Sequence, residues 1–228
     1  MRAFLEKNKI YFETITPSII SIIALVISLS SLNMTKRQIE ISTSDAQPHF
    51  YIKEYYLYDS DLKLAYEKEL KIYNSGADVT NYEDTLHTLA SIEFHSEKGK
   101  ETIDIPLNGY YGGSSKTQDS KGEMTKYIGP NNNILFSRIN DGISSVTFRE
   151  KYGFASISLN HAVRISYKSK LSNEGYAYFI NTISVSKEEY ESFMDAFNKS
   201  NFVDFYKLTP NVIGAAIEKA RTSKVNNM

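Results

Sequence analysis

Hydrophobic residues follow three patterns along this chain, and the first is an uninterrupted apolar run near the N-terminus. Residues 14–35 contain no charged side chain and are dominated by isoleucine, leucine and valine. As a helix, this stretch would span roughly 33 Å at about 1.5 Å per residue, enough for a hydrocarbon core of about 30 Å. We therefore predict a single transmembrane helix over residues 14–35, preceded by an N-terminal tail over residues 1–13.

Two other interpretations of the apolar run are open. It could be a cleaved signal peptide, with Lys7 and Lys9 as the basic start and Ser28-Leu29-Ser30 as a cleavage site. It could also be a buried core helix. The run is long for a signal peptide and has no polar face, so the pattern favours a single-pass span in the cell membrane. Basic residues flank both ends in nearly equal number, so the side of the membrane that carries the soluble part is not determined.

Small residues within the run raise the question of whether the span is more than an anchor. Ala24 and Ser28 lie four residues apart, a spacing that lets two membrane helices approach closely. They are therefore the candidates for self-association through the span. The alternative is that each serine hydroxyl bonds back to the preceding turn of its own helix.

The second pattern begins after Pro48, where apolar and polar residues alternate with the period of a β-strand. Before it, residues 36–47 are expected to continue the helix briefly and then form a linker. Within residues 48–185 we expect about eight strands with turn-rich connections and no intervening helix. This layout predicts a mainly β protein whose soluble domain is an antiparallel, immunoglobulin-like β-sandwich.

The alternation is clearest in three of the expected strands. In residues 155–167, apolar side chains occupy odd positions. Val146 and Phe148 are interpreted as part of a further strand. One strand is expected to place Leu86, Ala90, Ile92 and Phe94 on one face and His87, Ser91, Glu93 and His95 on the other.

The third pattern has helical spacing and occupies residues 186–228. Ser186 and Glu189 form a capping box ahead of an apolar i, i+3, i+4, i+7 series that begins at Tyr190. Thr209 and Pro210 then provide an N-cap and a first-turn proline for a second helix. Two C-terminal α-helices are therefore predicted.

Residues 108–133 fit none of these patterns. They contain five glycines and few apolar residues, and a loop of this length in a compact domain is usually functional or mobile. Met124 to Ile128 could form a short strand within it. Tyr110 and Tyr111 are the candidate contacts for a partner protein, because exposed tyrosine is favoured at interfaces. The alternative is that these two rings pack against the domain.

Composition removes several classes of function. The chain has 26 basic and 27 acidic residues, which argues against a nucleic-acid partner. It has no cysteine, so disulfides, thiolate metal sites and cysteine nucleophiles are excluded. Glu93, His95 and His87 could share a strand face, but a solvated polar face explains them, and Gly112–Lys116 lacks the spacing of a phosphate-binding loop. We therefore predict no catalytic residue, no cofactor and no metal.

These observations favour a membrane-anchored, non-enzymatic interaction module that binds another protein. The plan of one span followed by a small β domain is similar to that of many bacterial membrane proteins, although no motif names a family. Two alternatives remain. One is a membrane-acting effector or sensor subunit, of a stress or anti-phage type, that oligomerises through its span. The other is an enzyme with a site under residues 108–133, which would need convergent titratable groups in a pocket.

Overall fold

The computed structural model divides the chain into two compact units, Met1–Gln47 and Pro48–Met228. The residues it describes are 2–9, 13, 15–61, 63–96, 99–169, 174–199 and 201–225.

In the described residues of the N-terminal unit, the structure has the helices α1 (Arg2–Lys7) and α2 (Thr16–Asp45). α2 covers residues 16–35 of the apolar run and most of the segment expected to follow it as a helix and linker, while residue 14 lies outside the described residues. Its Thr16–Ser42 stretch is long and apolar enough to cross a membrane, and none of its apolar window is buried. The expected apolar helix is thus confirmed. Length and composition of this kind are shared by membrane spans and signal sequences.

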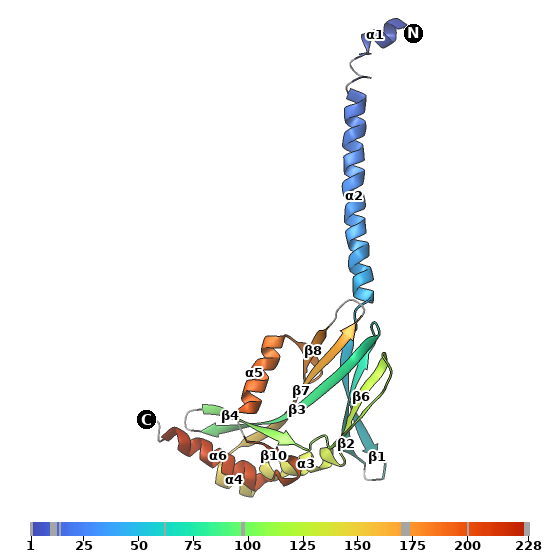
Figure 1. Cartoon of the computed structure of the whole chain (residues 1–228). Helices are drawn as coiled ribbons and strands as arrows, with labels where there is room; N and C mark the ends of the chain where they lie inside the picture. The colour runs from blue at the N-terminus through green and yellow to red at the C-terminus, as the bar shows by residue number, and fades with distance from the viewer. Residues whose placement is uncertain are drawn as a thin grey trace. The chain divides into compact units, whose positions relative to one another are not determined.

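The C-terminal unit is built on two β-sheets (Figure 1), and its ten described strands exceed the expected eight. The four-stranded sheet has the order β1-β2-β6-β5, and the six-stranded sheet has the order β10-β4-β3-β7-β8-β9. The strands are β1 (Phe50–Asp59), β2 (Leu64–Asn74), β3 (Val79–Ser96), β4 (Gly99–Asn108), β5 (Gly113–Lys116), β6 (Gly122–Ile128), β7 (Ala155–Ser169), β8 (Gly175–Ile180), β9 (Ile183–Val185) and β10 (Val203–Asp204).

Helices follow and interrupt the strands in the described part of this unit. They are α3 (Asn132–Ile143), α4 (Val146–Tyr152), α5 (Lys187–Asn198) and α6 (Pro210–Val225), and a 3-10 turn covers Phe205–Lys207. Both predicted C-terminal helices are confirmed. The capping box is present at α5, where the Ser186 hydroxyl accepts from the Glu189 amide at 3.2 Å and the Glu189 carboxylate accepts from the Ser186 amide at 2.9 Å.

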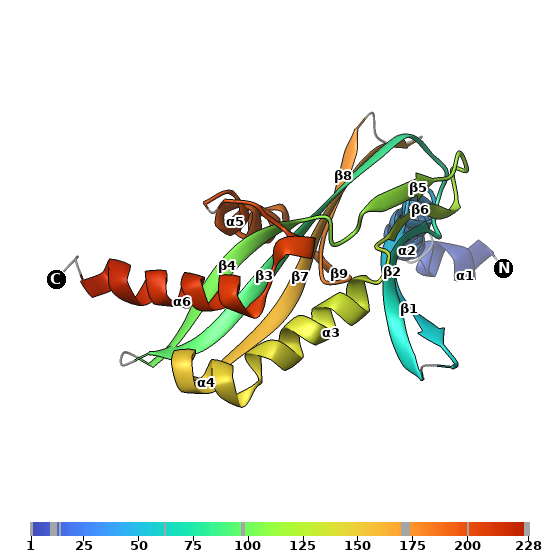
Figure 2. The same ribbon diagram turned by 90° about the horizontal axis from the view of Figure 1, so that it is seen from below.

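One face of the six-stranded sheet carries the core, in two halves. The long strands β3 and β7 pair antiparallel along most of their length, and their apolar side chains alternate as the sequence predicts. In one half, Ala90, Ile92 and Phe94 pack with α3, α4 and α6, which lie along the same strands (Figure 2). In the other half, Val163 and Ile165 pack against the inner face of the four-stranded sheet.

This division of the core explains why the immunoglobulin-like arrangement is not confirmed. In a sandwich, two sheets cover each other face to face. Here helices cover part of one sheet, and α3 and α4 interrupt the strand series between β6 and β7, where no helix was expected. The expectation that Val146 and Phe148 belong to a strand is wrong, because both lie in α4 and Phe148 is buried in the helical half of the core. β10 also pairs parallel to β4 rather than antiparallel.

The prediction of a long loop over residues 108–133 is also wrong. This segment contains β5 and β6, which pair antiparallel, and it ends in the first turn of α3. The short strand expected from Met124 to Ile128 is confirmed within β6. Its glycines misled the sequence interpretation because they lie in turns or at the first residue of a short strand. Gly109 and Gly122, for example, have φ of 84° and 93°, a conformation that other residues rarely adopt.

Candidate functional site

Tyr110 and Tyr111, the predicted partner contacts, lie in the interior. The Tyr110 side chain is 2% exposed, and its ring meets Phe205 edge-on at a centroid distance of 4.9 Å. The Tyr111 ring stands edge-on to Tyr110 at the same distance and belongs to both halves of the core. The rings are therefore not exposed as expected: Tyr110 is buried, Tyr111 is half-buried, and both pack against the domain. The reason is that two core halves meet here and need large apolar side chains.

A histidine that the sequence gave no reason to single out lies between these rings. His161 is 2% exposed, and its Nδ1 is 3.1 Å from the Thr88 hydroxyl. Burial and, secondly, the charge of Lys68 lower the pKa of His161 to about 3. Within the described part of the chain, His161 Nε2 and the Tyr111 hydroxyl are buried without a hydrogen-bond partner. These titratable groups converge as an enzyme site would require, but they are enclosed in the core.

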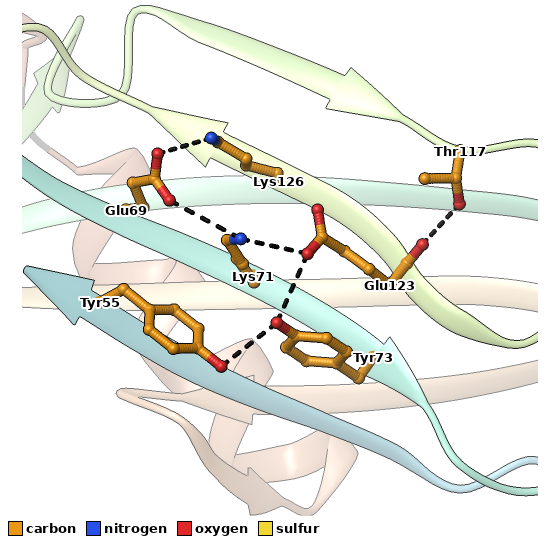
Figure 3. A network of polar contacts seen from close by, with 7 residues as sticks. All are labelled: Tyr55, Glu69, Lys71, Tyr73, Thr117, Glu123 and Lys126. Atoms are coloured by element: carbon orange, nitrogen blue, oxygen red, sulfur yellow. Dashed lines mark hydrogen bonds and ion pairs between the residues drawn. The ribbon is translucent and has the colours of Figure 1, made fainter. Parts of the chain in front are cut away.

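The outer face of the four-stranded sheet carries a different tyrosine cluster (Figure 3). The rings of Tyr51 and Tyr73 stack with centroids 5.1 Å apart, and the hydroxyls of Tyr55 and Tyr73 are 3.2 Å apart. Tyr51 and Tyr55 are each 38% exposed. The Tyr73 hydroxyl also contacts the Glu123 carboxylate at 3.4 Å. Burial, followed by the hydroxyl of Tyr55, raises the pKa of Tyr73, so this hydroxyl stays protonated and remains a hydrogen-bond donor.

Ion pairs continue this cluster across the sheet. Glu69 accepts from Lys126 at 2.6 Å and lies 3.9 Å from Lys71, which in turn pairs with Glu123 at 3.2 Å. The hydrogen bond to Glu69 is the main cause that raises the pKa of Lys126. Glu69 is only 5% exposed, because its neighbours' side chains lie over it. We call the residues Tyr51, Lys53, Tyr55, Glu69, Lys71, Tyr73, Glu123 and Lys126 the outer-face network.

Strand register explains why this network forms. Lys71 and Lys126 are directly opposite each other on β2 and β6, an arrangement that like charges disfavour. Glu69, which pairs with both lysines, and Glu123, which pairs with Lys71, offset that repulsion. On β1, Tyr51 and Lys53 alternate with the buried Ile52, so the apolar core fixes which side chains face outward. The network is therefore preformed by the fold.

The sequence could have indicated this site. Tyr51, Lys53 and Tyr55 alternate around Ile52 on β1, and Glu69, Lys71 and Tyr73 alternate around Leu70 and Ile72 on β2. Those patterns mark a tyrosine-bearing polar face on each strand. They do not show that the two strands are neighbours, and only that pairing turns two rows of residues into one surface.

The remaining candidates are placed as follows. The Ser28 hydroxyl donates to the Ala24 carbonyl at 2.8 Å, so the alternative of bonding within the helix is what the structure shows for this serine. Glu93 pairs with Lys100 at 2.8 Å, and the His87 ring packs edge-on against Phe197. Among the described residues no group of three metal-ligating side chains comes together.

Gly112–Lys116, the glycine-rich segment, is mostly β5 rather than a phosphate-binding loop. Its Lys116 reaches the fully buried Asp84 carboxylate at 2.7 Å. The hydroxyls of Thr125 and Tyr127 also donate to Asp84. The lysine therefore balances a buried charge, which is a structural role.

Comparison of the sequence with known proteins finds no matching family model and no matching curated protein.

Proposed function

We propose that this protein is a membrane-anchored, non-enzymatic interaction module that binds another protein through the outer-face network of its four-stranded sheet. The observation that carries the proposal is the preformed cluster of part-exposed tyrosines held by ion pairs between β2 and β6. Tyrosine gives a large contact area at little conformational-entropy cost, and it is enriched at protein interfaces.

The charges of the network indicate the chemistry of the partner. Lys71 and Lys126 are already paired with glutamates, whereas Lys53 has no ion pair among the described residues and lies 5.4 Å from the centre of the Tyr51 ring. A cation beside exposed aromatic rings suits a carboxylate on the partner. The partner surface is therefore a protein surface with an acidic residue opposite Lys53.

The anchor can be tested first. The full-length chain should stay in the membrane fraction after high-salt and carbonate washing, because a span of this hydropathy is not released by either. The measurement is a blot of pellet and supernatant. Recovery in the supernatant would remove the membrane part of the proposal.

The interface is tested by site-specific photo-crosslinking of the full-length protein in its native cells. A photoreactive phenylalanine analogue is placed at Tyr51 or Tyr55, and as a control at Tyr206, an exposed tyrosine (53%) outside the four-stranded sheet. We expect one protein adduct from both sheet positions and not from Tyr206. A further K53E substitution should weaken that adduct by charge repulsion. Equal adducts at all three positions, or none, would contradict the assigned surface.

A further inference from the structure

A groove of about 610 Å³ lies between α5 and the six-stranded sheet, on the face opposite to the core. Its size falls within the range of about 300–1,000 Å³ that is usual for small-molecule sites. It is separate from the outer-face network, so an inference about it does not depend on the proposed interface.

Strand register and helix periodicity build the two walls. Thr85, Arg164 and Tyr178 are paired across β3, β7 and β8, so they form one row on the sheet. Opposite this row, α5 presents Lys187 and Tyr190, which are three residues apart and lie on one side of the helix. Polar and aromatic groups therefore converge from four elements.

Aromatic contacts hold the helix against the sheet at two points. Tyr190 meets Tyr178 with ring centroids 5.0 Å apart, and Phe197 meets His87 at 4.8 Å. These two α5 residues are seven positions apart, which corresponds to roughly 10 Å along a helix. These large rings hold α5 away from the sheet, and the groove lies in the space between the helix and the sheet.

The groove carries an unbalanced positive charge. Lys187 pairs with Glu191 at 3.5 Å, but the Arg164 guanidinium has no ion pair among the described residues. The pKa of His87 is lowered first by burial and second by the charge of Arg164. Burial raises the pKa of Tyr190, and the charge of Arg164 acts in the opposite direction. His87 is therefore neutral at pH 7, and the groove has a net charge of about +1 from Arg164, Lys187 and Glu191.

We propose that this groove binds a small organic anion with a planar ring, whose carboxylate or phosphate pairs with Arg164 while its ring packs against Tyr178. A guanidinium matches either oxyanion through two parallel hydrogen bonds. The tyrosine wall supplies the flat contact that an aromatic ligand needs. Lys187 at the rim adds a second attractive charge.

The test is calorimetric titration of the full-length protein in detergent micelles. The ring-bearing anions are adenosine 5′-monophosphate, which carries a phosphate, and salicylate, which carries a carboxylate. Adenosine and salicylamide are their neutral counterparts, and inorganic phosphate is an anion without a ring. We expect at least one ring-bearing anion to bind, and which one binds separates the two oxyanion classes. Its neutral counterpart and inorganic phosphate should each bind at least about tenfold more weakly.

Variants then locate the site. Arg164→Gln should weaken binding by about tenfold to a hundredfold, the usual effect of removing a hydrogen bond to a charged group. Arg138→Gln, an exposed arginine on α3, is the matched control and should leave binding unchanged. Thermal melting of both variants checks that the fold is intact. Unchanged binding by a folded Arg164→Gln protein, equal binding of the neutral counterpart, or no binding by either ring-bearing anion would overturn the proposal.

Discussion

Tyr110–Tyr111 and Tyr51–Tyr55–Tyr73 are two tyrosine clusters in the same unit, and their environments are opposite. The first lies where the two halves of the core meet and packs against His161 and Phe205. The second lies on the outer face of the four-stranded sheet among lysines and glutamates. In the first cluster the Tyr111 hydroxyl is buried without a hydrogen-bond partner among the described residues. In the second, the hydroxyls of Tyr55 and Tyr73 bond to each other, and that of Tyr73 also bonds to Glu123.

The comparison shows that the neighbours of a tyrosine in sequence do not decide its role. Tyr110 and Tyr111 stand between glycines, which suggested an exposed loop, yet they fill the core. Tyr51 and Tyr55 lie in β1, where no binding role was predicted, and they are part-exposed. Packing uses the ring of a tyrosine, whereas recognition also uses its hydroxyl, so the accessible cluster is the better candidate for binding.

The largest expected effect is a difference between the two clusters in how much a substitution lowers the free energy of unfolding. Tyr110→Ala should lower the free energy of unfolding by about 3–5 kcal/mol, because it removes a buried ring and leaves a cavity. Tyr51→Ala should cost about 1 kcal/mol or less, since its ring is part-exposed and loses mainly a stacking contact. Urea unfolding of residues 48–228, followed by circular dichroism, measures both. Similar losses for the two variants would remove the distinction between interior and surface clusters.

A smaller effect is expected from pH. The pKa of His161 is about 3 in the folded protein and should be near 6.5 in the unfolded chain, so the unfolded state binds the extra proton as pH falls. Stability contributed by the neutral imidazole is thus present above pH 6.5 and is lost progressively down to about pH 3. Between pH 7 and pH 5 this residue alone should cost about 2 kcal/mol.

The matched variant for this prediction is His161→Gln, which cannot titrate. All other titratable groups are common to both proteins, so only the difference between their unfolding free energies reports on His161. The wild-type protein should lose about 2 kcal/mol more than the variant between pH 7 and pH 5, measured by urea unfolding at each pH. Parallel pH profiles would show that His161 is not buried as a neutral group.

The smallest effect is expected in the apolar helix, where the hydroxyls of Ser21, Ser28 and Thr35 each donate to the carbonyl four residues earlier. Because these donors are satisfied within the helix, replacing Ala24 and Ser28 with leucine should weaken self-association by about 1 kcal/mol at most in a membrane reporter assay. A polyleucine span should likewise leave partner binding intact. If the protein loses its activity in cells when the span is replaced with polyleucine, the oligomerising effector would be favoured over the interaction module.

Local signals in the sequence identified the elements whose stability is local. The capping box at Ser186 and Glu189 and the N-cap at Thr209 correctly placed both C-terminal helices, because a helix end is built from residues a few positions apart. Strict alternation likewise placed β3 and β7 and assigned their inner faces. The apolar run of α2 was evident from its length alone.

Elements that depend on distant partners were not predictable in the same way. Val146 and Phe148 have the spacing of a strand, but they form α4 because Phe148 and Tyr152 bury their rings together against α6. β5 and the start of β6 were assigned to a loop because their pairing partners come from each other and from β2, about fifty residues earlier. Propensity is a weak prior that tertiary packing overrides.

By itself, the sequence determined that the chain has an apolar N-terminal helix, a mainly β remainder and two terminal helices, since periodicity and capping are properties of neighbouring residues. Tertiary structure alone decided which tyrosines are buried, that Glu69 and Glu123 balance Lys71 and Lys126 across two strands, and that Arg164 faces α5. The physical reason is strand pairing. Register and sheet order bring together residues from distant positions, and both are fixed by how the whole core is buried.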